Sequence, residues 1–182
     1  MGDIEINRVW EMPNSKTFRI KAIKEIILKY AHGVVIDPFA NEMSIKNCIK
    51  NCKYISNDID IEFNTDYHLE AQDFMKTFED SSIDVVLFDP PYSGRQVSEC
   101  YKKLGKTVTM SDTNSGYFTK FKTEISRILK PGGIVISCGW NTNGIGKKYG
   151  FKIIEILDVA HGSMHNDTLV TVEVKEKQNE QN

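Results

Sequence analysis

Short, continuous apolar runs alternate with segments of helical periodicity along most of this chain. Apolar runs of this kind are typical of parallel strands that are covered by helices on both faces of a sheet. The expected strands are residues 33–37, 53–58, 67–71, 84–90, 133–140, 151–160 and 168–175. The expected helices are residues 17–30, 43–52, 73–79, 117–130 and 143–148. The pattern therefore predicts an α/β fold with a mostly parallel sheet of seven strands.

The last two expected strands, residues 151–160 and 168–175, are joined by only seven residues. A parallel crossover needs about a dozen residues or more, so this pair should be antiparallel. At 182 residues the chain is long enough for one domain with its own core. Within this single domain, residues 1–182, we expect an N-terminal arm at 1–16, a long loop at 93–115 and a flexible tail at 175–182.

The charge balance and the cysteines narrow the class of protein. The formal net charge is −2, so contact with a polyanion requires a local basic patch rather than a global positive field. The four cysteines lack a second pair of ligands at zinc-site spacing, so we expect reduced thiols and no metal site. No apolar stretch approaches the ~20 residues that span a bilayer, and the acidic start MGDIEI is unlike a secretory signal. We therefore expect a cytoplasmic protein without membrane contact.

Residues 87–92 read LFDPPY and complete one of the apolar runs. The run places Asp89 at the carboxyl end of a buried strand, and Pro90 and Pro91 fix the backbone of the turn that follows. The Asp89 carboxylate and the Pro90 carbonyl are both acceptors, and neither proline has an N–H that competes for them. Tyr92 adds a ring face for a heterocycle. This combination suits a pocket that holds the planar amino group of a base.

The DPPY segment resembles motif IV of the amino-methyltransferases, which methylate adenine or cytosine amino groups with S-adenosylmethionine. The layout of the span from Thr17 to Val174 likewise resembles the Rossmann-like class I methyltransferases. The resemblance implies a sheet with a C-terminal antiparallel strand pair and helices on both faces. It also implies that the four residues of the DPPY turn are catalytic, with direct in-line transfer to the amine and no covalent intermediate.

The resemblance places the cofactor at the ends of earlier strands. The residues that resemble motif I, which holds the methionine part of the cofactor, are Asp37, Pro38, Phe39 and Ala40. The family usually continues with glycines that let the backbone approach the ligand closely. This chain has other residues there, namely Asn41, Glu42, Met43 and Ser44. At this turn the chain therefore departs from the pattern of the family.

Residues at two further strand ends and before the first helix extend the expected cofactor site. Asp58, about twenty residues past the first turn, is placed to accept hydrogen bonds from both ribose hydroxyls. Family members commonly set an acid and an apolar residue against the adenine, and Asp73 and Phe74 stand there in this chain. Asp73 is equally suited to be a plain helix N-cap. Thr17 and Phe18 occupy the place of the family's motif X, which packs over the cofactor.

Basic and aromatic residues near the DPPY turn form the expected substrate surface. The loop at 93–115 opens directly from that turn, and loops of such length are more often functional than not. The residues assigned to substrate contact are Arg95, Lys102, Lys103, Trp140, His165 and Asn166. Larger family members add a recognition domain for which this chain has no space, so we expect phosphate contacts and short or relaxed sequence recognition.

The sequence thus predicts a cytoplasmic, S-adenosylmethionine-dependent DNA amino-methyltransferase that forms N(6)-methyladenine. DNA is the expected partner, with RNA as the second choice, and no cognate nuclease is implied. Two alternatives stay open, a ribosomal RNA base amino-methyltransferase and a methyltransferase-like binding subunit without activity. The absent motif I glycines are the feature that favours the inactive subunit.

Overall fold

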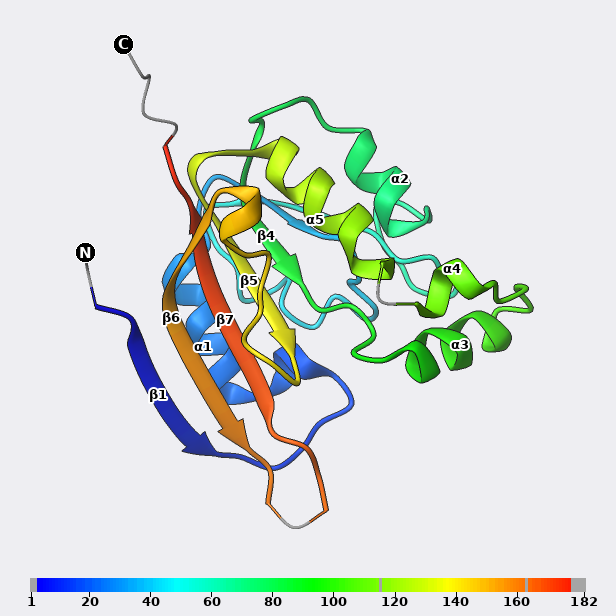
Figure 1. Ribbon diagram of the computed structural model, residues 1–182, viewed down its shortest axis with the longest axis horizontal. Helices are drawn as coiled ribbons and strands as arrows, with labels where there is room; N and C mark the ends of the chain where they lie inside the picture. Colours follow the sequence, from blue (N-terminus) through cyan, green and yellow to red (C-terminus); the bar gives the residue numbers. More distant parts are fainter. Residues whose placement is uncertain (1–2, 115, 163, 178–182) are drawn as a thin grey trace.

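The computed structural model describes residues 3–114, 116–162 and 164–177. In this part of the chain seven strands form one sheet in the order β1-β6-β7-β5-β4-β2-β3 (Figure 1). The strands are β1 (Glu5–Trp10), β2 (Val34–Asp37), β3 (Lys53–Ser56), β4 (Ile83–Phe88), β5 (Leu129–Gly139), β6 (Phe151–Ala160) and β7 (Thr168–Lys175). Neighbouring strands are parallel except that β7 is antiparallel to both β5 and β6. The predicted mostly parallel sheet with a C-terminal antiparallel pair is confirmed.

Helices cover both faces of the sheet, as predicted. They are α1 (Lys21–Tyr30), α2 (Ala71–Lys76), α3 (Gly94–Lys103), α4 (Met110–Thr113) and α5 (Tyr117–Ile128), with 3-10 turns η1 (Thr17–Arg19) and η2 (Lys147–Tyr149). In Figure 1, α1 lies behind the sheet, and α2 and α5 lie on the other side. Ile27 of α1 shares one core with Val85, whereas Ile125 of α5 shares a second core with Val86. Successive residues of β4 therefore point into opposite cores, as the pleat of a strand requires.

The seven strands are not the seven that the sequence pattern predicts. The expected strand at 67–71 forms only one isolated bridge, from Tyr67 to Asn57. The Asp66 carboxylate accepts hydrogen bonds from the N–H and the hydroxyl of Ser56, at 2.8 and 2.7 Å, so a side chain satisfies the edge of β3. The remaining strand is β1, which lies in the expected N-terminal arm. Its side chains are mostly exposed, and it therefore lacks the apolar run that marks the other strands.

Two expected helices are interrupted by backbone conformations that an α-helix excludes. The expected helix at 17–30 breaks at Ile20, whose ψ of 123° is extended and separates η1 from α1. The expected helix at 43–52 is a series of turns instead. Met43 and Asn51 adopt positive φ values of 50° and 60° there. Positive φ is a left-handed conformation, so a continuous right-handed helix cannot form across these positions.

The expected long loop at 93–115 contains α3 and α4, and its last residue lies outside the described residues. The Ser93 hydroxyl accepts a hydrogen bond from the Gln96 N–H at 3.3 Å and so caps the start of α3. Val97 on α3 is only 1% exposed, so the helix is anchored in the core. The prediction of an open loop at this position is wrong.

The remaining predicted boundaries differ less from the observed ones. The expected helix at 117–130 is the shorter α5, and the Pro-Gly-Gly sequence after it lies within β5. The expected helix at 143–148 does not form, and the 3-10 turn η2 overlaps only its last two residues. Residue 175 of the expected tail ends β7, whereas residues 178–182 lie outside the described residues. Residues 1 and 2 of the expected arm lie outside them as well.

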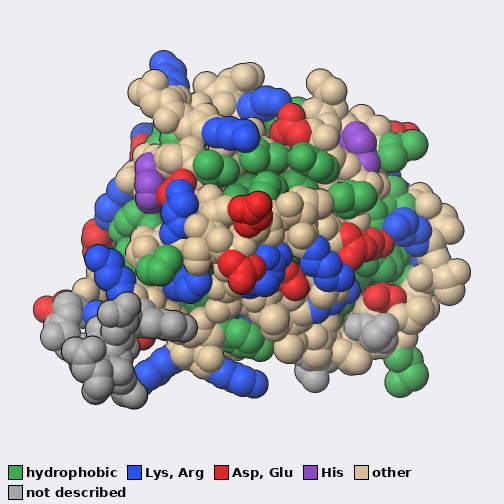
Figure 2. Space-filling model, turned by 90° about the horizontal axis from the view of Figure 1, so that it is seen from above, with side chains coloured by type: hydrophobic (Ala, Val, Ile, Leu, Met, Phe, Trp, Pro, Cys, Tyr) green, Lys and Arg blue, Asp and Glu red, His purple; other side chains and the backbone are tan. Residues whose placement is uncertain are grey.

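The surface at the amino ends of β4 and β5 carries mixed charge (Figure 2). Lysine and arginine side chains lie among aspartate and glutamate side chains on this face rather than in a separate patch. This face therefore offers no extended basic surface to a polyanion. Within the described residues, no helix combines the length and the apolar character that a membrane span needs.

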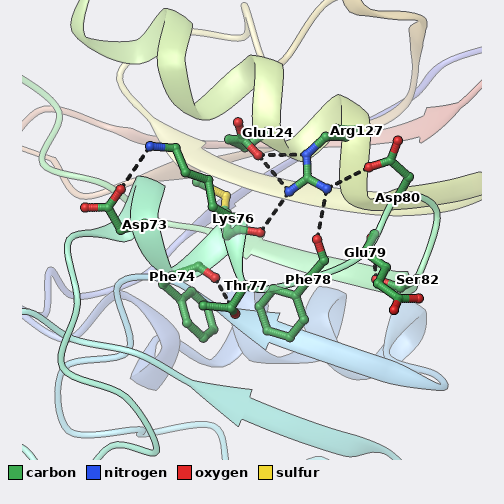
Figure 3. A network of polar contacts seen from close by, with 11 residues as sticks. Asp73, Phe74, Lys76, Thr77, Phe78, Glu79, Asp80, Ser82, Glu124 and Arg127 are labelled. Carbon is green, nitrogen blue, oxygen red and sulfur yellow. Dashed lines mark hydrogen bonds and ion pairs between the residues drawn. The ribbon is translucent and has the colours of Figure 1, made fainter.

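Arg127 joins the end of α5 to the end of α2 and the segment after it (Figure 3). Its guanidinium donates to the carbonyl oxygens of Phe78 and Met75, at 2.9 and 3.2 Å. It also pairs with the carboxylates of Asp80 and Glu124, at 2.7 and 2.8 Å. The planar Arg127 guanidinium thus bonds two backbone carbonyls and two carboxylates at once.

Arg127→Met is expected to lower the free energy of unfolding by roughly 2 kcal/mol, because the carbonyls of Phe78 and Met75 lose their charged donor. Urea unfolding of both proteins at pH 7 measures the difference. Lys76→Met is the matched control, because Lys76 forms an exposed ion pair with Asp73 at 3.0 Å, and it should cost less than about 0.5 kcal/mol. Equal losses in the two variants would contradict the role given to Arg127.

Candidate active site

A cleft with a volume of about 550 Å³ opens beyond the carboxyl ends of β2, β3 and β4. Its walls come from the segment around η1, the turns after the three strands, the start of α2 and one side of α3. Ligands of open parallel sheets bind at this edge of the sheet. The volume is in the range of roughly 300–1,000 Å³ that is usual for small-molecule and cofactor sites.

Asp89 follows the last residue of β4 and lies half-buried in the cleft wall. Its carboxylate accepts a hydrogen bond from the Tyr92 hydroxyl at 2.5 Å and another from the Thr17 side chain. Burial raises the pKa of the Asp89 carboxyl group, and the hydrogen bonds from Tyr92 and Thr17 oppose that rise. Pro90 and Pro91 line the cleft on the same turn. The structure thus brings together the whole DPPY turn and Thr17.

Asp37 ends β2 but lies beneath the cleft rather than in its wall. The fully buried carboxylate accepts hydrogen bonds from the Tyr54 hydroxyl at 2.7 Å and from the Phe39 N–H at 3.3 Å. Burial raises the pKa of Asp37 to about 7 against these two hydrogen bonds, and the charges of Asp89 and Asp58 add to the rise. The residues of this segment that line the cleft are Pro38, Phe39 and Ala40. Asp37 therefore supports the turn from below and is not placed to touch a ligand.

The turn after Ala40 contains positive φ values that are typical of glycine, although it has no glycine. Asn41 and Met43 adopt positive φ values of 48° and 50°. The Asn41 N–H donates to the Asp58 carboxylate at 2.9 Å, and the Asp60 N–H donates to the same carboxylate at 2.9 Å. Asp58 lines the cleft, and burial raises its pKa. Asp58 therefore fixes the turn and also presents a carboxylate at the end of β3, where the sequence predicts it.

Asp73 and Phe74 do not line the cleft. Both lie on α2, where the exposed Asp73 pairs with Lys76 at 3.0 Å. Phe74 is fully buried, and its ring centroid lies 5.3 Å from that of Tyr67 and 5.1 Å from that of Phe78. Phe18 does line the cleft, beside Thr17. The adenine contact expected from α2 is therefore not available to either Asp73 or Phe74.

Glu70 is the acidic residue that this segment contributes to the cleft. It is also the N-cap residue of α2, so Asp73 has neither of the two roles considered for it. The Glu70 carboxylate accepts hydrogen bonds from the Tyr101 hydroxyl and the Lys106 ammonium, both at 2.9 Å. These bonds hold α3 and the segment after it against the start of α2.

The expected basic substrate residues divide between the cleft and the outer surface of α3. Lys103 lines the cleft and pairs with Asp60 at 3.6 Å. Arg95 is exposed and pairs with Glu99 at 2.8 Å. Lys102 is exposed as well, and neither it nor Arg95 lines the cleft.

The other expected substrate residues lie beyond the ends of β5 and β6. Trp140 is 43% exposed, and its ring centroid lies 5.7 Å from that of Tyr92, in an edge-to-face arrangement. His165 and Asn166 are exposed between β6 and β7 and do not line the cleft. Thr168, the first residue of β7, does line it. Trp140 therefore stands beside the DPPY turn, through its contact with Tyr92.

Comparison with known proteins identifies the fold. The sequence matches no protein-family profile and no curated protein. TrmN from Thermus thermophilus matches with a TM-score of 0.58 and 16% identity, over 86% of this chain and 49% of TrmN. The 1,6-didemethyltoxoflavin-N1-methyltransferase of Burkholderia thailandensis, with bound S-adenosylhomocysteine, matches with a TM-score of 0.54 and 10% identity, over 79% of this chain and 71% of that one. A putative methylase from Haemophilus influenzae matches with a TM-score of 0.53 and 10% identity, over 86% and 88%.

This chain has the Rossmann-like methyltransferase fold. At these identities the likeness extends to the fold alone. The chain also spans only about half the length of TrmN, at 49% of that protein. In the methyltransferase fold, the cleft of this chain lies at the edge of the sheet where ligands of doubly wound proteins bind.

The sequence pattern missed the wall that α3 gives to the cleft. Ser93 followed by Gln96 three residues later is the capping-box pattern of a helix start. Val97, Tyr101 and Leu104 then repeat at the spacing of one helix face, and all three line the cleft. Both signals were present in the sequence and predict α3 correctly when they are read together.

The pattern also missed the end of the N-terminal arm. The cleft residues from this segment are Asn14, Ser15 and Lys16. Their sequence carries no local signal, because their position depends on the pairing of β1 with β6 across the sheet. Among the described residues, no group of three or more His, Cys, Asp or Glu side chains is arranged to hold a metal ion.

Proposed function

We propose that this protein transfers a methyl group from S-adenosylmethionine to the exocyclic amino group of a nucleobase, N(6) of adenine in DNA, in the cytoplasm. The observation that carries the proposal is the position of Asp89, whose carboxylate stands with Pro90 and Tyr92 in the wall of the cleft that also holds Asp58. The Asp89 carboxylate, which suits an amine, and the Asp58 carboxylate, which suits ribose hydroxyls, thus line the same cleft.

The side chains of the cleft fit S-adenosylmethionine. Asp58 uses one lone pair of each carboxylate oxygen for a backbone N–H, and the remaining lone pairs are able to accept ribose hydroxyls. Phe63 and Leu69 add apolar surface to the cleft. The bound cofactor would supply an electrophilic methyl group on a sulfonium. The left-handed turn at Asn41 and Met43 supports a working cofactor site rather than an inactive one, because the chain reaches there the positive φ values that glycine adopts readily.

The DPPY turn explains how a weak nucleophile reacts. The lone pair of an exocyclic amine is delocalised into the ring, so the planar amine attacks poorly. The Asp89 carboxylate and the Pro90 carbonyl accept its two N–H groups and favour a pyramidal nitrogen. The negative charge of Asp89 also offsets the positive charge that develops on this nitrogen. On transfer, the amine nitrogen would take the methyl group from the sulfonium sulfur, and its surplus proton would pass to Asp89 or to water.

DNA is the proposed polymer because the mouth of the cleft suits a base that has left a stack. Tyr92 and Trp140 present rings beside Asp89, and an extruded base needs such surfaces. Arg95 and Lys102 lie exposed on α3, and their positive charges support the proposed contact with phosphates.

Methyl transfer from cofactor labelled in its methyl group tests the proposal directly. The purified protein is incubated with DNA, ribosomal RNA or bulk protein, and the products are digested and identified by nucleoside mass spectrometry. We expect label in DNA as N(6)-methyladenine. Label in ribosomal RNA alone would assign the RNA alternative, and absence of transfer to every acceptor would contradict the enzymatic proposal.

A further inference from the structure

Two cationic side chains line the cleft in the part of the chain that the structure describes, Lys16 and Lys103. They stand in different places. Lys103 comes from α3 and pairs with Asp60, close to Asp58 and the proposed ribose position. Lys16 comes from the N-terminal arm and directly precedes Thr17, whose side chain bonds Asp89. The Lys16 ammonium lies 5.7 Å from the centroid of the Phe63 ring, which also lines the cleft.

The ammonium of Lys16 is held by the turn that replaces the glycines of the family. It lies 3.0 Å from the Asn41 side-chain oxygen and 3.1 Å from the Glu42 carboxylate. The Lys16 side chain is only 24% exposed, so the pair is partly shielded from water. Glu42 also lines the cleft, and its second oxygen pairs with Arg19 at 3.0 Å. The Lys16 ammonium from the arm and the Glu42 carboxylate from the turn thus lie side by side on the wall of the cleft.

A zwitterion is the chemical group that complements such a pair. S-adenosylmethionine ends in an α-ammonium and an α-carboxylate, a short aliphatic chain away from its sulfonium. In a glycine-rich turn, backbone N–H and carbonyl groups come close enough to bind these charges. Here Asn41 and Glu42 carry side chains at that position, and Asn41 N–H is already bonded to Asp58. The Lys16 and Glu42 side chains carry opposite charges at this turn and line the cleft.

Resting on the proposed function, we infer that Lys16 and Glu42 form the binding site for the amino-acid end of the cofactor. Lys16 binds the carboxylate, and Glu42 binds the ammonium. When the cofactor binds, its carboxylate pairs with the Lys16 ammonium and its ammonium pairs with the Glu42 carboxylate. Neither side chain is therefore left unpaired. Arg19 holds Glu42 from the outer side and positions it.

Calorimetric titration with three ligands tests the roles of Lys16 and Glu42 separately. They are S-adenosylmethionine, its decarboxylated form, which keeps the ammonium, and methylthioadenosine, which lacks the amino-acid end altogether. K16M is expected to weaken binding of the full cofactor roughly 10- to 100-fold, the usual range for loss of a charged hydrogen bond. It should leave the decarboxylated form and methylthioadenosine within about threefold of wild type. E42Q should weaken both ammonium-bearing ligands by about tenfold or more and leave methylthioadenosine unchanged.

K21M is the matched control, because Lys21 is 77% exposed and pairs with Glu25 on α1. It should bind all three ligands as wild type does, and thermal melting checks that each variant is folded. A loss of methylthioadenosine affinity equal to the loss of cofactor affinity would overturn the inference, as would full cofactor affinity in K16M. Wild-type protein that binds none of the three ligands would instead overturn the proposed function, and this inference with it.

Discussion

Asp89→Ala is expected to lower kcat/KM for methyl transfer by roughly a thousandfold while the affinity for S-adenosylmethionine stays within about threefold of wild type. The Asp89 carboxylate interacts with the amine that is being methylated, and its charge matters most as positive charge develops there. The cofactor is held by other residues of the cleft, such as Asp58. Labelled methyl transfer gives the first quantity, and calorimetry gives the second.

Tyr92→Phe provides the comparison for this experiment. It removes the hydroxyl that donates to Asp89 at 2.5 Å but keeps the ring that lies against Trp140. Because the carboxylate remains, we expect a loss of activity of only about tenfold. Asp89→Ala protein with wild-type activity would remove the proposed catalytic role. A parallel loss of cofactor affinity would mean that Asp89 shapes the cleft rather than the reaction.

The sequence located Asp58 and Asp89 because both follow the ends of parallel strands, and parallel strands end at one edge of the sheet. The same rule predicts Asp37 for the cofactor site, whereas the structure buries this side chain beneath the cleft. Position at a strand end does not say whether a side chain points into the cleft or beneath it. The Tyr54 hydroxyl and the Phe39 N–H decide this for Asp37, and they come from a neighbouring strand and the following turn.

The last two strands, β6 and β7, were predicted to the residue, because their apolar runs are long and clearly bounded. The pattern failed where a local sequence is ambiguous. It assigned 67–71 to a strand, although the Asp66 side chain satisfies the neighbouring edge of β3. It left β1 as an arm, because an edge strand with exposed side chains has no apolar run. Such elements are fixed by contacts with distant residues.

The buried Asp37 makes stability depend on pH. Its pKa is about 7 in the folded protein, whereas an aspartate in an unfolded chain has a pKa of about 3.9. The folded state therefore holds the proton more tightly than the unfolded state does. The stability that this group contributes is fully present below about pH 4 and is lost progressively as the pH rises toward 7. Above that pH the loss is complete and constant.

Asp37→Asn is expected to stabilise the protein relative to wild type by roughly 3 kcal/mol more at pH 8.5 than at pH 5, because asparagine carries no charge that must be buried. The asparagine oxygen is able to accept the Phe39 N–H, and its amide is able to donate to the Tyr54 hydroxyl, so the turn keeps its hydrogen bonds. Urea unfolding of both proteins at the two pH values measures the difference. A difference that does not change with pH would show that Asp37 is ionised to the same extent in the folded and unfolded states.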